Sequence, residues 1–345
     1  MNIILKLIYS GSAELLEYLQ AHVVTCLVPA FFIAGAIAVF VSKQSVLKYF
    51  GAHARKTVSY SIASISGCIL AACSCTVIPL FAGIYRRGAG IGPATAFLYS
   101  GPAINILAIV FTARVLGFKV GVARAVMAIV MAVVIGLIMA SLYKGEDRQK
   151  VQSPEMYGES ENPHRKVIFL LNLVLILVIG ASSLEFSVKW PAVLLLLLIL
   201  VFQIMKWQDR SETKLWFSET WNLGKMIFPY LLIGVFAAGV IKDFLPPEYV
   251  SQYVGGNSVS ANAIASVAGA LMYFATLTEV PIVESLVSLG MGEGPELALL
   301  LAGSALSLPN MLAIRQVLGT QKTLTYIGLV VVFATLSGIV YGGIA

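Results

Sequence analysis

Three of the four cysteines, Cys68, Cys73 and Cys75, lie within eight residues of one apolar stretch. Thiolates bind soft ions such as Cu(I), Zn(II) and trivalent arsenic species. Cys73 and Cys75 point about 200° apart on a regular helix, so both sulfurs converge only where the segment unwinds. The cluster therefore predicts either a soft-metalloid site or, alternatively, small side chains that pack between helices.

A single carboxylate interrupts a second apolar stretch, where Glu279 lies between Thr278 and Val280. A charged residue at the centre of a membrane helix costs about 2.5 to 3.5 kcal/mol on insertion scales, and residues retained despite that cost are functional by default. We therefore predict that Glu279 exchanges a proton inside the membrane. The alternative is a loop position at the interface, which we expect for Glu284.

Prolines accompany both stretches. Pro79 and Pro281 have no N–H, so within a helix the carbonyl four residues earlier loses its partner. Unpaired carbonyls at membrane depth are tolerated only where protein or a polar cavity satisfies them. The pair predicts two broken helices beside a shared cavity, with a mere packing kink as the other interpretation.

The stretches that follow repeat this pattern. SGPAIN (100–105) and AGSALSLPN (302–310) each combine a proline, Pro102 or Pro309, with neutral polar side chains. The predicted cargo-binding residues are Cys73, Ser74, Cys75, Thr76, Pro79, Asn105, Thr278, Glu279, Pro281, Ser307 and Asn310. Cys68 joins Cys73 and Cys75 as a candidate ligand of a soft metalloid, and Glu279 is the candidate for proton coupling.

The composition places these residues in a bilayer. Of 345 residues, 59% are hydrophobic and only 12% are charged, whereas a soluble domain carries roughly 25% charge. The net charge of +6 does not indicate nucleic-acid binding, because Lys and Arg lie between apolar runs, as membrane anchors do. No nucleotide-binding loop or cofactor motif is present, so we expect neither a cofactor nor an enzymatic activity.

Apolar runs divide the chain into about ten candidate transmembrane helices, with a range of 8 to 11. The predicted organisation is a surface amphipathic helix (1–20), a first membrane repeat (21–143), a polar linker (144–166), a two-helix insert (167–207) and a second membrane repeat (220–345). The fold class is therefore an all-α integral membrane protein. Basic residues in the loops do not decide on which side the N-terminus lies.

The two membrane repeats are predicted from a comparison of the chain with itself. Residues 74–117 and 276–319 align at one offset, which pairs Pro79 with Pro281 and Gly101 with Gly303. Duplicated units around a midplane site are a pattern of secondary transporters. The sequence predicts two homologous four-helix repeats with broken helices, and leaves open whether they are parallel or inverted.

The combination CSCTVIPLFAGIYRRGAGIGPATAFLYSGPAIN with TLTEVPIVESLVSLGMGEGPELALLLAGSALSLPNML resembles the prokaryotic predicted-permease family of the ArsP and YraQ kind. The resemblance covers nearly the whole chain apart from residues 144–220. It implies an inner-membrane permease that exports a soft metal or metalloid compound, such as a trivalent organoarsenical. The CSC motif of that family maps to residues 73–75, and its TEVP motif maps to residues 278–281.

Our leading functional prediction is alternating-access efflux, driven by an ion gradient. A related transporter of copper, zinc or another small ion is the alternative, as are a passive channel and an importer. A membrane thiol oxidoreductase built on Cys73 and Cys75 is a further class, but the chain has no C-x-x-C or haem motif to support it. The expected partners are the lipid bilayer and a small-molecule or metalloid cargo, with the oligomeric state open.

Overall fold

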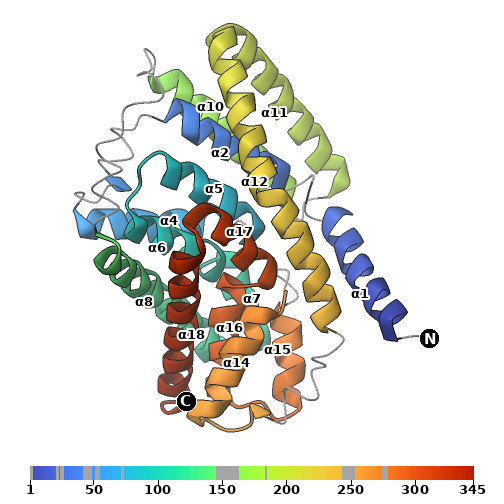
Figure 1. Ribbon diagram of the computed structural model, residues 1–345, viewed down its shortest axis with the longest axis vertical. Helices are drawn as coiled ribbons and strands as arrows, with labels where there is room; N and C mark the ends of the chain where they lie inside the picture. The colour runs from blue at the N-terminus through green and yellow to red at the C-terminus, as the bar shows by residue number, and fades with distance from the viewer. Residues whose placement is uncertain are drawn as a thin grey trace.

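The computed structural model describes residues 3–20, 23, 27–41, 49–50, 55–70, 74–144, 163–182, 185–242, 253–273 and 279–345. Within these ranges the chain is helical and contains no β-strand. Figure 1 shows α2, α10, α11 and the first half of α12 at one end of the molecule, with α14, α16 and α18 at the other end. The all-α fold class is confirmed.

The first helix does not stand alone. α1 (Ile3–Tyr18) lies along the second half of α12 (Arg210–Lys242), as Figure 1 shows. The Ser10 hydroxyl donates to the Gly239 carbonyl at 2.8 Å. A Cβ on Gly11 would come within 2.7 Å of the Phe236 ring, so the glycine lets the two helices approach closely. The predicted surface helix therefore packs against the body of the protein.

The first half continues with α2 (Val28–Phe40), α4 (Lys56–Leu70), α5 (Ser74–Arg86), α6 (Ile91–Ala103), α7 (Ile106–Val115) and α8 (Phe118–Leu142). α6 is buried along its whole length between α4, α5 and α8. A Cβ on Gly101 would meet the Val77 side chain at 2.5 Å. Small residues on α6 thus let its neighbours come close, which is how membrane helices gain contact area.

The middle of the chain forms a helical hairpin. α10 (Pro163–Ala181) pairs with α11 (Phe186–Trp207), and the Asn172 amide joins them by donating to the Gln203 side-chain oxygen at 3.2 Å. α10 also packs on α2, where the Phe169 ring meets both Phe40 and Trp216 of α12 edge to face. The predicted linker falls largely on residues 145–162, which lie outside the described residues.

The second half contains α14 (Val259–Leu271), α15 (Glu279–Ser288), α16 (Glu293–Ala305), α17 (Leu308–Leu318) and α18 (Thr320–Gly342). α16 and α17 begin 202 residues after α6 and α7, and α18 begins 202 residues after α8. The contacts correspond as well: α5 packs on α17, α15 packs on α7, α6 packs on α16, and α8 packs on α18.

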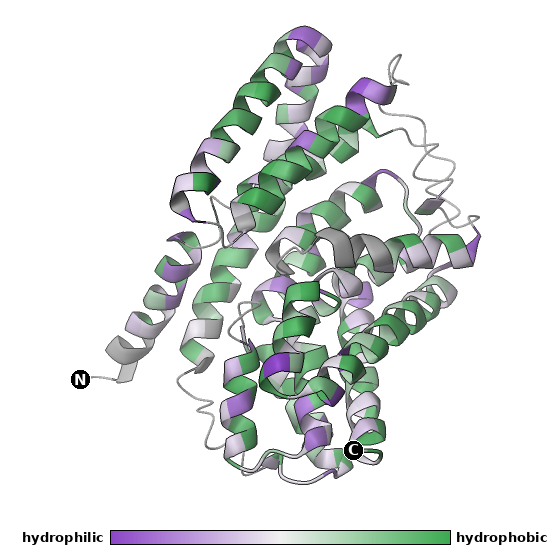
Figure 2. Cartoon of the chain, turned by 180° about the vertical axis from the view of Figure 1, so that it is seen from behind, coloured by the Kyte–Doolittle hydropathy of each residue, from purple (hydrophilic) through white to green (hydrophobic). Residues whose placement is uncertain are grey.

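Three of the described helices are long and apolar enough to cross a membrane: Phe118–Leu142, Ser187–Trp207 and Thr320–Gly342. The number rises to 5 if each of two bent pairs, α6 with α7 and α16 with α17, counts as one span. Hydrophobic residues dominate these helices, as Figure 2 shows. The described residues thus contain three to five candidate crossings. The predicted total of ten also counted apolar runs that form shorter helices in the structure.

Candidate functional site

A buried ion pair joins the two halves of the chain. Arg124 on α8 donates from Nη2 to Oε2 of Glu279 on α15 at 2.8 Å. The two side chains are 1% and 2% exposed. Removing two charges from water costs several kcal/mol per ion, which only close contact and further hydrogen bonds offset. Burying this ion pair therefore costs desolvation free energy, and the pair lies where the two halves of the chain meet.

Local structure brings both charges to this point. Glu279 is the first residue of α15, where the helix dipole favours a negative side chain. Arg124 lies in the second turn of α8, and its Nη1 donates to the Thr112 hydroxyl of α7 at 2.9 Å. The helix turn between α7 and α8 requires Gly117, whose φ of 113° is unfavourable for other residues.

Gly121 then sets the spacing between α7 and α8. A Cβ at this position would lie 2.5 Å from the Ala113 Cβ. Because Gly121 has no side chain, α7 and α8 approach closely enough for the Thr112 hydroxyl to reach Arg124. Thr112 in turn donates to the Ala108 carbonyl at 2.7 Å. Arg124 is thus held by a chain of hydrogen bonds as well as by Glu279.

Buried Tyr99 lies near the ion pair, and buried Tyr326 lies near Tyr99. The Tyr99 hydroxyl on α6 donates to the Leu301 carbonyl on α16 at 3.3 Å, and the two residues are 202 positions apart. Tyr326 on α18 occupies the position that corresponds to Arg124 on α8 at this same offset. Tyr99 lies within electrostatic range of Tyr326, Arg124 and Glu279, and both tyrosines are fully buried.

Several polar atoms at this junction have no hydrogen-bond partner among the described residues. They are Arg124 Nε, Glu279 Oε1 and the Tyr326 hydroxyl. Leaving such a group unpaired costs about 1 to 3 kcal/mol, and more if it is charged. The ion-pair junction, which we define as Tyr99, Thr112, Arg124, Glu279 and Tyr326, thus retains free hydrogen-bonding capacity for a proton, a water molecule or a ligand.

The predicted breaks at Pro102 and Pro309 are confirmed. α6 and α7 bend by 43°, and α16 and α17 bend by 49°. Asn105 caps α7, with its side chain accepting from the N–H groups of Leu107 and Ala108. Ser307, 202 positions later, caps α17 by accepting from the N–H of Asn310 at 3.4 Å. These side chains satisfy helix N-termini that would otherwise be unpaired inside the protein.

The prediction of a broken helix at Pro79 needs correction, whereas the break at Pro281 stays a prediction. α5 continues from Ser74 to Arg86 through the buried Pro79. The missing N–H would have bonded Cys75 in the first turn, so only one hydrogen bond at the start of the helix is lost. Pro281 is the third residue of α15, and residues 274–278 before it, including Leu277, lie outside the described residues. Proline is compatible with the beginning of a helix.

The structure describes only some of the predicted cargo-binding residues around the cysteines. Cys73 and Thr278 lie outside the described residues, and so do the side chains of Cys68, Ser74 and Cys75. Thr76 is buried in the first turn of α5. Among the side chains that the structure describes, no group of three His, Cys, Asp or Glu residues could hold a metal ion. The proposed cysteine ligands are not among those side chains.

Comparisons with known proteins agree with this architecture. Residues 9–343 match the family described as "Predicted permease". The chain belongs to this permease family. The UPF0718 protein MJ0584 of Methanocaldococcus jannaschii is 46% identical and covers 99% of this chain and 98% of its own length. The UPF0718 protein YraQ of Escherichia coli is 25% identical over 90% of this chain and 73% of its own length. No solved structure matches the permease.

Sequence reasoning missed Arg124 in this permease. The signal was present, because Arg124 lies within the apolar stretch that became α8, five residues after the exposed Lys119 at its start. The argument that singled out Glu279 applies to Arg124 equally. Thr112 and the two tyrosines carried no comparable signal. These three residues come close to the ion pair only through packing between helices that are far apart in the sequence, and spacing along the chain does not reveal such packing.

Proposed function

We propose that this membrane permease transports its cargo by alternating access, with the Arg124–Glu279 ion pair as its coupling site. The observation that carries the proposal is the burial of both charges at the contact between the two halves. An ion pair there stabilises one arrangement of α7, α8 and α15. A transporter needs a contact of this kind, whose strength changes during the cycle, to couple an ion to a conformational change.

Proton exchange at Glu279 provides that change. A proton that binds the Glu279 carboxylate neutralises it and leaves Arg124 as an uncompensated buried cation. Such a cation is costly, and the guanidinium cannot lose its own proton. Protonation therefore favours an arrangement in which Arg124 reaches water or an anionic group, and deprotonation favours the closed ion pair. An inward proton gradient can drive outward transport by this exchange.

Two four-helix repeats, related through the ion-pair junction, form the framework of the proposal. Its support is the common offset of 202 residues for α6, α7 and α8, together with the reciprocal packing of α5 on α17 and α15 on α7. In this proposal the bent pairs line the cargo path, and Asn105, Ser307 and Asn310 supply its neutral hydrogen-bonding groups. The proposed total of about ten crossings would then include helices that are broken inside the membrane.

A soft metal or metalloid compound is the proposed cargo, with a trivalent organoarsenical as the leading example and copper or zinc as the alternative. Cys68, Cys73 and Cys75 support this proposal, since soft ligands select soft ions. The direction is efflux and the location is the inner membrane. Cys68 lies in the last turn of α4 and Cys75 in the first turn of α5, while Cys73 lies outside the described residues. α5 contacts both α6 and α17.

Two sets of variants test the proposal in sealed vesicles. Uptake of methylarsenite, arsenite, Cu(I) and Zn(II) is measured in inverted membrane vesicles with and without an imposed pH gradient. We expect uptake of a thiophilic cargo to depend on the gradient and to fall at least tenfold in Glu279→Gln. The matched control Glu284→Gln, an exposed carboxylate on the same helix, should transport as the parent does.

A separate variant tests the proposed cargo. Replacing both Cys73 and Cys75 with Ser should abolish uptake of the thiophilic cargo and leave the response of the Glu279 junction to pH unchanged. Gradient-dependent uptake that survives Glu279→Gln would exclude the coupling role. Uptake that survives the double cysteine replacement would exclude thiolate recognition of the cargo.

A further inference from the structure

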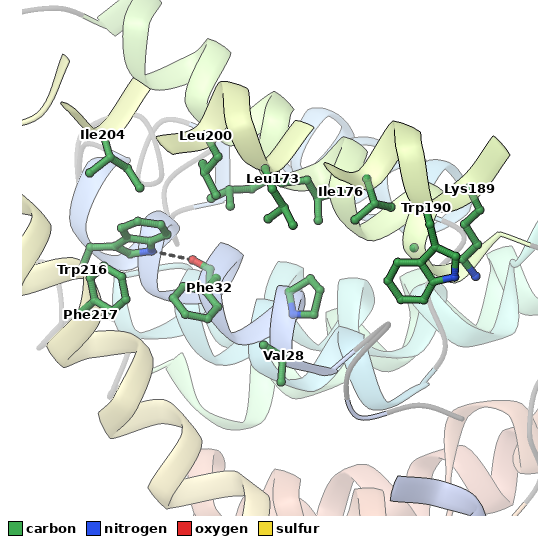
Figure 3. Close-up of a pocket in the computed structure, with 14 residues that line it drawn as sticks. Val28, Phe32, Leu173, Ile176, Lys189, Trp190, Leu200, Ile204, Trp216 and Phe217 are labelled. Carbon is green, nitrogen blue, oxygen red and sulfur yellow. Dashed lines mark hydrogen bonds between the residues drawn. The ribbon is translucent and has the colours of Figure 1, made fainter. Parts of the chain in front are cut away.

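A narrow apolar pocket lies away from the ion-pair junction, between α2, α10, α11 and α12. Its volume is about 350 Å³, at the lower end of the range for small-molecule sites. Figure 3 shows its wall of aliphatic and aromatic side chains, with Lys189 and Trp190 at one end and Trp216 with Phe217 at the other. The helices of the proposed transport cycle, α7, α8 and α15, do not contribute to this wall.

The pocket follows one face of α11. The α11 residues that line it are Lys189, Trp190, Val193, Leu197, Leu200 and Ile204. Steps of three and four residues keep side chains on one face of a helix. From Lys189 to Ile204 the pocket extends about 22 Å along the axis, which exceeds the thickness of one bilayer leaflet, about 15 Å. It is therefore long enough for a whole acyl chain.

The helix that forms this wall is the least buried of the three candidate membrane spans among the described residues. Residues Ser187–Trp207 form a candidate membrane span of which only 11% is buried inside the protein. Lys189 and Trp190 are the third and fourth residues of that span. Tryptophan concentrates at the level of the lipid headgroups, and lysine near a helix end extends toward them. The cationic end of the pocket thus lies at headgroup level, and its apolar wall extends through the hydrocarbon to Ile204, near the other end of the span.

The charge of Lys189 complements a lipid phosphate. Its Nζ donates to the Ser182 carbonyl at 3.0 Å, which uses one of its three N–H donors. Among the described residues it has no ion-pair partner. At the other end, the Trp216 indole N–H is already satisfied by the Phe32 carbonyl at 2.8 Å, so the deep end of the pocket presents an apolar surface.

We propose that this pocket binds one acyl chain of a membrane phospholipid, with the lipid phosphate beside Lys189. The chain fills the slot between α11 and α2 as far as Trp216. The insert helices α10 and α11 would then hold a lipid as a structural ligand of the permease, which explains an apolar pocket that no protein side chain fills.

Trp216 provides a direct probe of occupancy, because it lines the deep end and is only 1% exposed. A variant with Trp190, Trp207 and Trp221 each replaced by Phe retains Trp216 as its single tryptophan. The full chain is reconstituted in phosphatidylglycerol vesicles whose acyl chains are brominated near their ends. Bromine quenches indole fluorescence only at short range, so we expect at least half of the emission to be lost relative to unbrominated vesicles.

Two matched variants locate the quenching lipid. In the single-tryptophan background, Val193→Phe with Leu197→Phe fills the pocket, while Leu194→Phe with Leu198→Phe adds the same rings to the outer face, where both leucines are 60% exposed. The pocket variant should recover most of the emission and the outer-face variant should not. Equal quenching in the two variants, or none in the parent, would overturn the proposal.

A separate titration does not depend on the folding of the filled variant. Brominated phosphatidylglycerol is added to the protein in detergent, and Lys189→Gln should require several times more lipid for half-maximal quenching. An unchanged titration would overturn the contact with the phosphate. If the recovered emission of the pocket variant instead accompanied dissociation of a dimer, the occupant would be a second copy of this chain, and the lipid proposal would be wrong.

Discussion

Arg124 and Glu279 are 155 positions apart in the sequence, and their side chains meet at 2.8 Å inside the protein. The two residues come from different halves of the chain, and each is held by its own helix. Since both side chains are almost completely buried, neither charge has bulk water as an alternative partner. Breaking or neutralising this contact should therefore affect both stability and transport.

Replacing Glu279 should destabilise the protein more than replacing Arg124. Glu279→Gln leaves a guanidinium that stays charged, so we expect a loss of about 3 to 5 kcal/mol, as for other broken buried pairs. Arg124→Gln should cost less, because the remaining carboxylate can take up a proton and become neutral. Thermal unfolding in detergent measures both. Equal melting temperatures for the two variants would contradict this reasoning.

Replacing both partners should separate stability from function. The double variant Arg124→Met with Glu279→Met removes both charges. A protein in which apolar residues replace both partners of a buried ion pair is often as stable as its parent. We expect a melting temperature near that of the parent and no gradient-driven uptake. The exposed pair Lys119→Met with Glu284→Met on the same two helices is the control. A double variant that still transports would show that the ion pair is only structural.

The spacing of α7 and α8 should be sensitive to Gly121. Gly121→Ala places a methyl group 2.5 Å from the Ala113 Cβ, so the helices must separate and the hydrogen bond from Arg124 to Thr112 should weaken. We expect a lower melting temperature and slower uptake. Gly328→Ala on α18 meets nothing within 4 Å and should be neutral or stabilising by up to about 1 kcal/mol. Similar losses in both variants would contradict the close-approach argument.

The side-chain caps at the two bends should both stabilise the protein. Asn105→Ala and Ser307→Ala each remove the side-chain acceptor of a helix N-terminus, at a cost of about 0.5 to 2 kcal/mol. Asn105 accepts from two N–H groups and Ser307 from one, so the loss should be larger for Asn105. Asn105→Asp and Ser307→Thr keep an acceptor and should retain most of the stability. Unfolding in detergent again provides the measurement.

The sequence predicted the all-helical fold, the permease family and the bends beside Pro102 and Pro309, because composition, repetition and proline act locally. It placed the break at Pro79 wrongly, since a proline near a helix start is compatible with the helix. The partner of Glu279 was not predicted. Arg124 joins it through the contact of α8 with α15, and such long-range packing leaves no periodic signal within either helix.

Opening and closing of the ion-pair junction is the central claim, and a distance measurement tests it most directly. Spin labels are attached through non-native amino acids at positions 119 and 284, exposed sites on α8 and α15, and their separation is measured by pulsed electron resonance. We predict two populations, with Glu279→Gln shifting the balance toward the longer distance. A single distribution, identical in the parent and in Glu279→Gln across acidic and neutral pH, would contradict the claim.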